Sequence, residues 1–150
     1  MRNAAILIVA FAATFCSMPQ TVHAIDTLIN ISVWNEADGG NGHTYAILRI
    51  TKNWTDANAL AKTIQLNGAY GNLATVASQE ENDFIINNVI TVSPSQPSAL
   101  DQFYLGGVWL QGEWTWQTNG YITFYNWASG EPNNSPGVEI VIAMWGLSHP

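Results

Sequence analysis

One loop-forming stretch of the sequence carries side chains that could bind a ligand. It reads "NWASGEPNNSPGVEI" and covers residues 126–140. Pro132 and Pro136 exclude a helix there and remove two backbone donors, so the stretch is predicted to be an ordered loop. Its side chains with ligand oxygens include Glu131, Asn133, Asn134 and Glu139. Carboxylates and amides offer hard oxygen ligands and amide donors, although a solvated loop can have the same composition.

The charge balance is acidic and limits the kinds of partner. Four Lys and Arg residues stand against eleven Asp and Glu residues, a formal net charge of −7. Beyond residue 24, only Arg49, Lys52 and Lys62 are basic. No basic patch is therefore expected for phosphates or for anionic lipid, which argues against nucleic-acid and membrane-surface binding. Calcium or neutral polyols suit such a surface better.

Two helices are predicted ahead of this loop. Asn53 can cap the first helix, and Asn67-Gly68 is predicted to end it. The apolar face of that helix consists of Trp54, Ala57, Leu60, Ala61 and Ile64. Ser78 and Glu81 form a serine-x-x-glutamate capping box for the second helix. Its buried stripe consists of Phe84, Ile85 and Val89.

Short strands with a period of two account for most of the remaining sequence. The expected strands are "HTYAILRI" (43–50), "FYLGGVWL" (103–110), "EWTWQT" (113–118), "YITFYNW" (121–127) and "GVEIVIAMW" (137–145). Asn119-Gly120 is predicted to join two of them as a hairpin. The tryptophans at these strand positions, Trp109, Trp114, Trp116 and Trp127, are expected in the core. The pattern predicts an α+β domain with two helices packed on short antiparallel sheets.

The first residues have the features of a secretory signal peptide. Arg2 precedes a short apolar run, and "TVHA" offers a cleavage site after Ala24. We expect residues 1–24 to be removed, residues 25–150 to form one domain, and the product to be secreted or periplasmic, with no membrane span. The single cysteine, Cys16, lies in this leader. The domain is thus predicted to have no disulfide, thiol catalyst or zinc–thiolate site.

The order of these signals resembles a C-type lectin-like domain from about Trp34 to the last residue. "NWTDANALAKTIQLNG" is similar to the first helix of the family, and "GNLATVASQEENDFI" to the link into its second helix. "GEWTWQTNGYITFYNWASGEPNN" resembles its hairpin and long loop. This last match is the most specific, because Trp-Thr-Trp, Asn-Trp and Glu-Pro-Asn occur in the family's order and spacing.

The resemblance implies a calcium-dependent carbohydrate site on the loop described first. It implies that Glu131 and Asn133 are ligands of calcium and of sugar hydroxyls, with Pro132 as a cis residue between them. Glu139 falls at the position of a third ligand. Glu-Pro-Asn in the family goes with mannose-type hydroxyls, so mannose-type glycans or a glycoprotein are the expected partners. A shallow site of this kind binds a monosaccharide in the millimolar range, about −4 kcal/mol.

Two features depart from the family pattern. The conserved disulfides are missing, as in many bacterial members. The family also carries a Trp-Asn-Asp strand after the Glu-Pro-Asn loop, and this sequence stops at Pro150 without such a triplet. The resemblance therefore implies a bacterial-type domain that is incomplete at its C-terminus, with part of its calcium ligands missing.

Other functions remain open from the sequence. A calcium-independent protein-binding module of the same family is the first alternative. A glycoside hydrolase needs only two suitably spaced carboxylates, and Glu113, Glu131 and Glu139 are available. The sequence offers no nucleophile with a base and no oxyanion site, however, so a protein that is not an enzyme is predicted.

Overall fold

The computed structural model of the chain describes residues 5–11, 28–50, 52–66, 68–91, 102–118, 120–133 and 137–145. Its strands are β1 (Ala5–Phe11), β2 (Leu28–Val33), β3 (Thr44–Ile50), β4 (Gln65–Leu66), β5 (Ala69–Leu73), β6 (Gln102–Leu110), β7 (Glu113–Trp116), β8 (Gly120–Tyr121) and β9 (Val141–Trp145). Its helices are α1 (Trp54–Ala61) and α2 (Gln79–Phe84), the latter continued by the π-helical η2 (Ile85–Ile90), with a 3-10 turn η1 (Glu36–Asp38). The predicted α+β class is confirmed. Within the described residues, no helix is long and apolar enough to cross a membrane.

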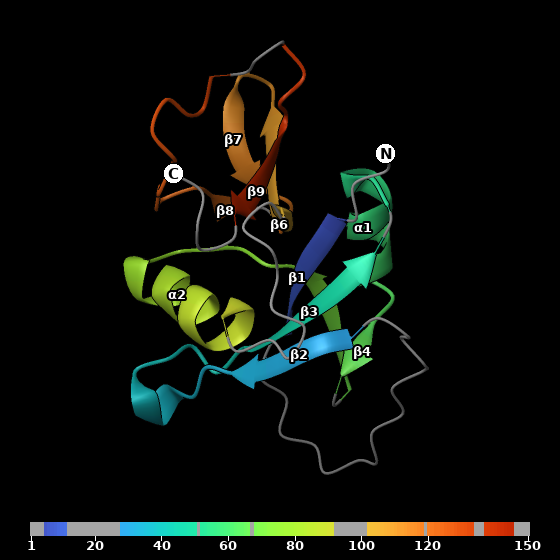
Figure 1. Ribbon diagram of the computed structural model, residues 1–150, viewed down its shortest axis with the longest axis vertical. Helices are drawn as coiled ribbons and strands as arrows, with labels where there is room; N and C mark the ends of the chain where they lie inside the picture. Colours follow the sequence, from blue (N-terminus) through green and yellow to red (C-terminus); the bar gives the residue numbers. More distant parts are fainter. Residues whose placement is uncertain are drawn as a thin grey trace.

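Backbone pairing links the strands into one branched sheet. The main order is β2-β3-β1-β6-β7-β8, with β9 paired to β6 and with β5 paired to both β1 and β4. Most pairs are antiparallel, and β1 with β6 is parallel. Figure 1 shows β6 to β9 gathered at one end of the molecule and β1 to β4 at the other, with α1 and α2 on different sides. The loop after β8 belongs to the first of these ends.

Strand β3 lies at the centre of the domain and is buried on both faces. Tyr45 and Ile47 are fully buried in a cluster with the second helical segment, β6 and β9. Ala46 and Leu48 are buried in a second cluster with α1 and β5. Because neighbouring residues of a strand point to opposite faces, this alternation lets one strand anchor both helices. A run of consecutive apolar residues in "TYAIL" is therefore required here.

Both helix starts were predicted and are confirmed. The Asn53 side chain accepts a hydrogen bond from the Asp56 amide at 2.9 Å, and the Ser78 hydroxyl accepts one from the Glu81 amide at 3.2 Å. The end of the first helix was predicted wrongly. Helix α1 ends at Ala61, and the residues around Gly68 instead form the tight connection of a β4–β5 hairpin.

Glu81 is a buried carboxylate with a complete set of donors. Its side chain is 4% exposed and accepts hydrogen bonds from the Tyr45 hydroxyl, the Asn41 amide at 3.1 Å and the Ala77 backbone amide at 2.7 Å. The last bond replaces the reciprocal contact to Ser78 that a capping box predicts. The network ties α2 to β3 and to the turn before it.

The aromatic stretch at 121–127 differs from its prediction. Only Gly120–Tyr121 form a strand, paired with β7, and the residues from 122 to 128 have no regular structure. Phe124 and Trp127 still pack against the core cluster. Tyr121 and Tyr125 are exposed, so the aromatic pattern indicates burial for only part of this stretch, and the backbone forms no strand beyond Tyr121 in it.

The N-terminal segment has a place in the sheet that the sequence did not suggest. All seven residues of β1 pair with β3, from Ala5 with Ile50 to Phe11 with Thr44. At the other edge of β1, Ile6 and Leu7 pair with β6, and residues 9–11 pair with β5. Cleavage after Ala24 stays a prediction.

Candidate functional site

The loop after β8 is anchored at its start by Trp127. This side chain packs against the core cluster, and its ring centroid lies 5.4 Å from that of Trp114 on β7. A turn follows, closed by a hydrogen bond from the Glu131 amide to the Ala128 carbonyl at 2.9 Å. Gly130 has a φ of 88°, a conformation that favours glycine. The sequence Ala-Ser-Gly-Glu thus sets the Glu131 side chain just beyond a packed tryptophan.

Glu131 and Asn133 form a close pair at the surface. The Glu131 carboxylate accepts a hydrogen bond from the Asn133 side-chain amide at 2.7 Å and another from the Asn133 backbone amide at 3.0 Å. Both residues are exposed, and the peptide bond between Glu131 and Pro132 is cis. One carboxylate and one carboxamide are therefore held side by side in reach of solvent. Asn134 and Pro136 lie outside the described residues.

Glu139 approaches the same region from the other side of the loop. It is exposed and stands just before β9, where the Ile140 carbonyl accepts a hydrogen bond from the Trp109 amide at 2.8 Å. Glu131, Pro132 and Glu139 line one cavity. The three residues singled out from the sequence thus divide into a hydrogen-bonded pair, Glu131 and Asn133, and a third residue on the same cavity.

The oxygen ligands available here are of the types that calcium binds, but they are few. Calcium takes about six to eight oxygen ligands from carboxylates, carbonyls and water. Glu131, Asn133 and Glu139 supply carboxylate and amide oxygens only. Among the described residues, no group of three or more His, Cys, Asp and Glu side chains is arranged to hold a metal ion. A calcium ion held here would need further oxygens from backbone, water or a bound hydroxyl ligand.

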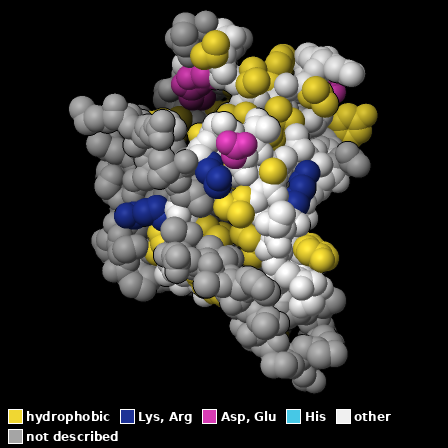
Figure 2. Space-filling view, turned by 90° about the vertical axis from the view of Figure 1, so that its right-hand side faces the viewer, with side chains coloured by type: hydrophobic (Ala, Val, Ile, Leu, Met, Phe, Trp, Pro, Cys, Tyr) yellow, Lys and Arg dark blue, Asp and Glu magenta, His cyan; other side chains and the backbone are white. Residues whose placement is uncertain are grey.

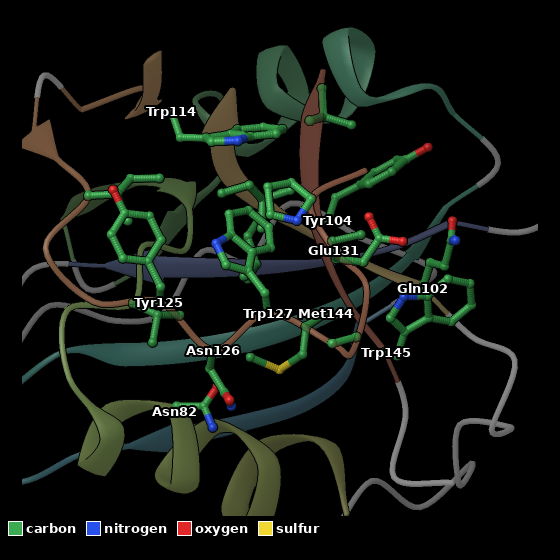
Figure 3. Close-up of a pocket in the computed structure, with 18 of the residues that line it drawn as sticks. Asn82, Gln102, Tyr104, Trp114, Tyr125, Asn126, Trp127, Glu131, Met144 and Trp145 are labelled. Atoms are coloured by element: carbon green, nitrogen blue, oxygen red, sulfur yellow. The ribbon is translucent and has the colours of Figure 1, made fainter. Parts of the chain in front are cut away.

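The cavity itself is large, and its lining is mainly apolar, with aliphatic as well as aromatic side chains. Its volume is about 770 Å³, within the range of small-molecule sites. The aromatic residues of its lining are Tyr104, Trp114, Trp116, Phe124, Tyr125, Trp127 and Trp145, and its amides are Asn82, Gln102 and Asn126. Figure 3 shows Trp114, Tyr125 and Trp127 toward one side of this cavity and Glu131, Gln102 and Trp145 toward the other.

Three rings of the lining, Trp114, Trp127 and Tyr125, belong to a row of aromatic side chains that Trp109, outside the lining, extends. Trp109, Trp114, Trp127 and Tyr125 follow one another with ring centroids 5.4, 5.4 and 6.1 Å apart. Trp116 is buried, and Trp114 and Trp127 are partly buried against the core, as predicted. Trp109 is 43% exposed, so its expected burial is wrong. It belongs to β6 and stands at the outer end of the row, where burial is incomplete.

Sequence reasoning missed the cavity and Tyr125. Tyr125 was read as one residue of an aromatic strand, and no sequence signal distinguishes it from its neighbours. Figure 2 shows the Lys and Arg side chains of one face lying apart from one another.

Comparisons with known proteins give distant relatives. Over 115 residues, the chain is 28% identical to a C-type lectin mannose-binding isoform of Oxyuranus scutellatus, a match that covers 72% of this chain and 65% of that protein. Over 102 residues, it is 28% identical to a snaclec coagulation factor IX/factor X-binding protein of Echis carinatus, which covers 65% of this chain and 75% of that protein. Over 122 residues, it is 27% identical to C-type lectin lectoxin-Lio1 of Erythrolamprus poecilogyrus, covering 77% of this chain and 65% of that protein.

The similarity is limited in extent. This chain spans 65% of the length of two of these three relatives. No protein-family model matches the chain, and no solved structure matches it. The arrangement of two helices and short antiparallel strands is consistent with the fold of the relatives' family.

Proposed function

Starting from its distant homology to C-type lectins, which supports the C-type lectin-like domain family, we propose that this protein is a calcium-dependent carbohydrate-binding protein of mannose-type specificity. The observation that carries the proposal is the pair formed by Glu131 and Asn133. Two adjacent sugar hydroxyls need acceptors and donors at one place, and this pair offers both at the surface. The signal-peptide features of residues 1–24 are a further support, since they predict export of the product.

Each residue has a distinct part in such a site. Calcium, when bound, supplies open coordination positions for two neighbouring hydroxyl oxygens. Glu131 accepts a hydrogen bond from one hydroxyl, and the Asn133 amide donates one to the other. Glu139 adds negative charge on the same cavity and completes the set Glu131, Asn133 and Glu139. Since the site is shallow and wet, a single sugar is held weakly, in the millimolar range, about −4 kcal/mol.

The proposal is tested on an immobilised mannose resin. The protein is expected to be retained in calcium, released by a chelator, and recovered without turnover of the sugar. Glu131→Gln with Asn133→Asp exchanges the sides on which carboxylate and amide stand, so retention is expected to move from mannose to galactose resin. Each mispaired polar contact costs about 1–3 kcal/mol, enough for a clear change. Glu113→Gln, on an exposed residue of β7, is the matched control.

Binding that is insensitive to the chelator would contradict the proposal, and so would unchanged sugar selectivity in the exchanged variant. The alternative is a calcium-independent protein-binding module. Two observations favour that alternative: one relative is named for binding coagulation factors, and the Asn133 amide already engages Glu131 within the chain. A protein partner that stays bound in chelator would support it.

A further inference from the structure

The cavity beside Glu131 combines aromatic surface with polar groups. Its aromatic side chains are accompanied by the amides of Asn82, Gln102 and Asn126 and by two carboxylates. The described residues of the lining include no Lys, Arg or His side chain. Ligand sites are typically lined by apolar side chains with a few polar groups that orient the ligand, and a lining without cations does not favour an anion. The composition fits a neutral ligand with both hydroxyl groups and an apolar face.

Tyr125 provides an aromatic surface that a ligand can reach. Its side chain is 55% exposed, while its ring lies against Trp127 with centroids 6.1 Å apart and an angle of 28°. Trp127 is held in turn by Trp114 at 5.4 Å and by the core. The tyrosine is thus oriented by stacked neighbours and yet open to solvent, as a ring prepared for stacking should be.

Tyr125 lies close in sequence to Glu131 and Asn133, the residues proposed to bind a sugar. Tyr125 and Glu131 belong to the same loop, and both line the cavity, with Trp127 and Asn126 between them in the sequence. A sugar held at Glu131 and Asn133 therefore has the cavity next to it. The volume of about 770 Å³ leaves room for more than a single small group.

We propose that this cavity is a second sugar subsite, in which the next pyranose ring of an oligosaccharide stacks on Tyr125 while its hydroxyls face Asn126. The C–H groups of a pyranose face match the negative face of an aromatic ring. The inference rests on the proposed function and deepens it, because it makes an oligosaccharide, rather than a single sugar, the ligand.

The test compares two ligands on the full chain by isothermal titration in calcium. Methyl α-mannoside fills the site at Glu131 alone, and an α-linked mannobiose reaches the cavity as well. The disaccharide is expected to bind about threefold to tenfold more tightly, the range given by one aromatic contact. Tyr125→Ala is expected to reduce this ratio to about one. Tyr121→Ala is the matched control, since Tyr121 is 81% exposed and lies outside the cavity lining.

The outcomes separate the two proposals. Binding of methyl α-mannoside with no gain for the disaccharide overturns the subsite and leaves the proposed function standing. A gain that survives Tyr125→Ala, or that is lost equally in Tyr121→Ala, also overturns the subsite. If neither ligand binds in calcium, the proposed function fails and the subsite with it. Quenching of tryptophan fluorescence by the disaccharide, but not in Tyr125→Ala, would support the stacked position.

Discussion

At the scale of single residues, Tyr45 and Glu81 form a hydrogen-bonded pair of a phenol and a carboxylate in the core. Tyr45 is fully buried and donates its hydroxyl hydrogen to the Glu81 carboxylate. Burial, and then the hydrogen bond to Glu81, raise the pKa of Tyr45 far above its ordinary value of 10.0. The neutral phenol is thus the form that the fold requires.

This pair predicts how stability depends on alkaline pH. The unfolded chain releases the Tyr45 proton above pH 10, while the folded chain keeps it, so the free energy of unfolding falls as pH rises beyond that value. The slope contributed by one proton is about 1.4 kcal/mol per pH unit. Tyr45→Phe should remove that contribution and, at neutral pH, cost about 1–3 kcal/mol because Glu81 loses a donor. Denaturant titrations from pH 7 to pH 11 measure both effects.

Tyr121→Phe is the control for this experiment, because its side chain is 81% exposed. It should leave stability at neutral pH unchanged. An alkaline slope that is the same in Tyr45→Phe and in the unaltered chain would show that the fold does not depend on the neutral phenol.

At the scale of elements, the glycines of β6 determine how closely the sheet approaches β5 and β9. A Cβ atom on Gly106 would lie 2.8 Å from the Leu73 carbonyl oxygen, a backbone atom that cannot rotate away. The Gly106 amide also donates to the Ala74 carbonyl at 2.8 Å. Close packing between the strands thus requires residues without a side chain at the two glycines of "FYLGGVWL".

Gly106→Ala is therefore expected to destabilise the fold by about 1–3 kcal/mol, the usual range for overpacking. Gly120→Ala is the matched control, since its added Cβ would meet only the Trp116 side chain at 3.7 Å, an ordinary contact. Thermal melts of both variants measure this loss of stability. Equal melting temperatures would mean that β6 can shift away from β5 without cost.

Local signals predicted the elements unequally. Caps depend on neighbouring residues, so Asn53 and Ser78 were identified from the sequence alone. The sequence Asn-Gly suits both a helix end and a hairpin; Asn67 lies outside the described residues, and Gly68 lies between the paired strands β4 and β5. The cavity could not be predicted, because Asn82, Gln102 and Trp145 come to Glu131 from separate elements. Glu131 and Asn133 were assigned as calcium and sugar ligands only through the resemblance to a family, and their hydrogen bonds to each other were not predicted.

At the scale of the whole molecule, β1 closes the space between β3 and β6. Its removal would leave one edge of β3 without the partner that it has here, and β3 carries the fully buried Tyr45, Ile47 and Leu48. Exposed apolar edges of this kind promote aggregation. The leader predicted at residues 1–24 thus contains the strand that joins the two parts of the sheet.

The comparison of residues 1–150 with residues 25–150 tests this role. The shorter chain is expected to melt at least about 5 °C lower and to scatter more light on heating. A chain of full length in which residues 5–11 are replaced by glycine and serine is the control for length, and it should behave like the shorter chain. Equal melting of all three proteins would show that β1 adds nothing to the sheet.

The position of β1 also has a consequence for the timing of export. A leader is accessible to a processing protease only while it is unpaired, and all seven residues of β1 are engaged by the backbone of β3. Folding and the cleavage predicted after Ala24 would therefore compete for the same segment. A chain that folds before cleavage would keep the predicted leader paired in its own sheet. A chain that is cleaved first would have to fold without β1 between β3 and β6. A factor that delays folding before translocation is thus expected to raise the yield of processed protein.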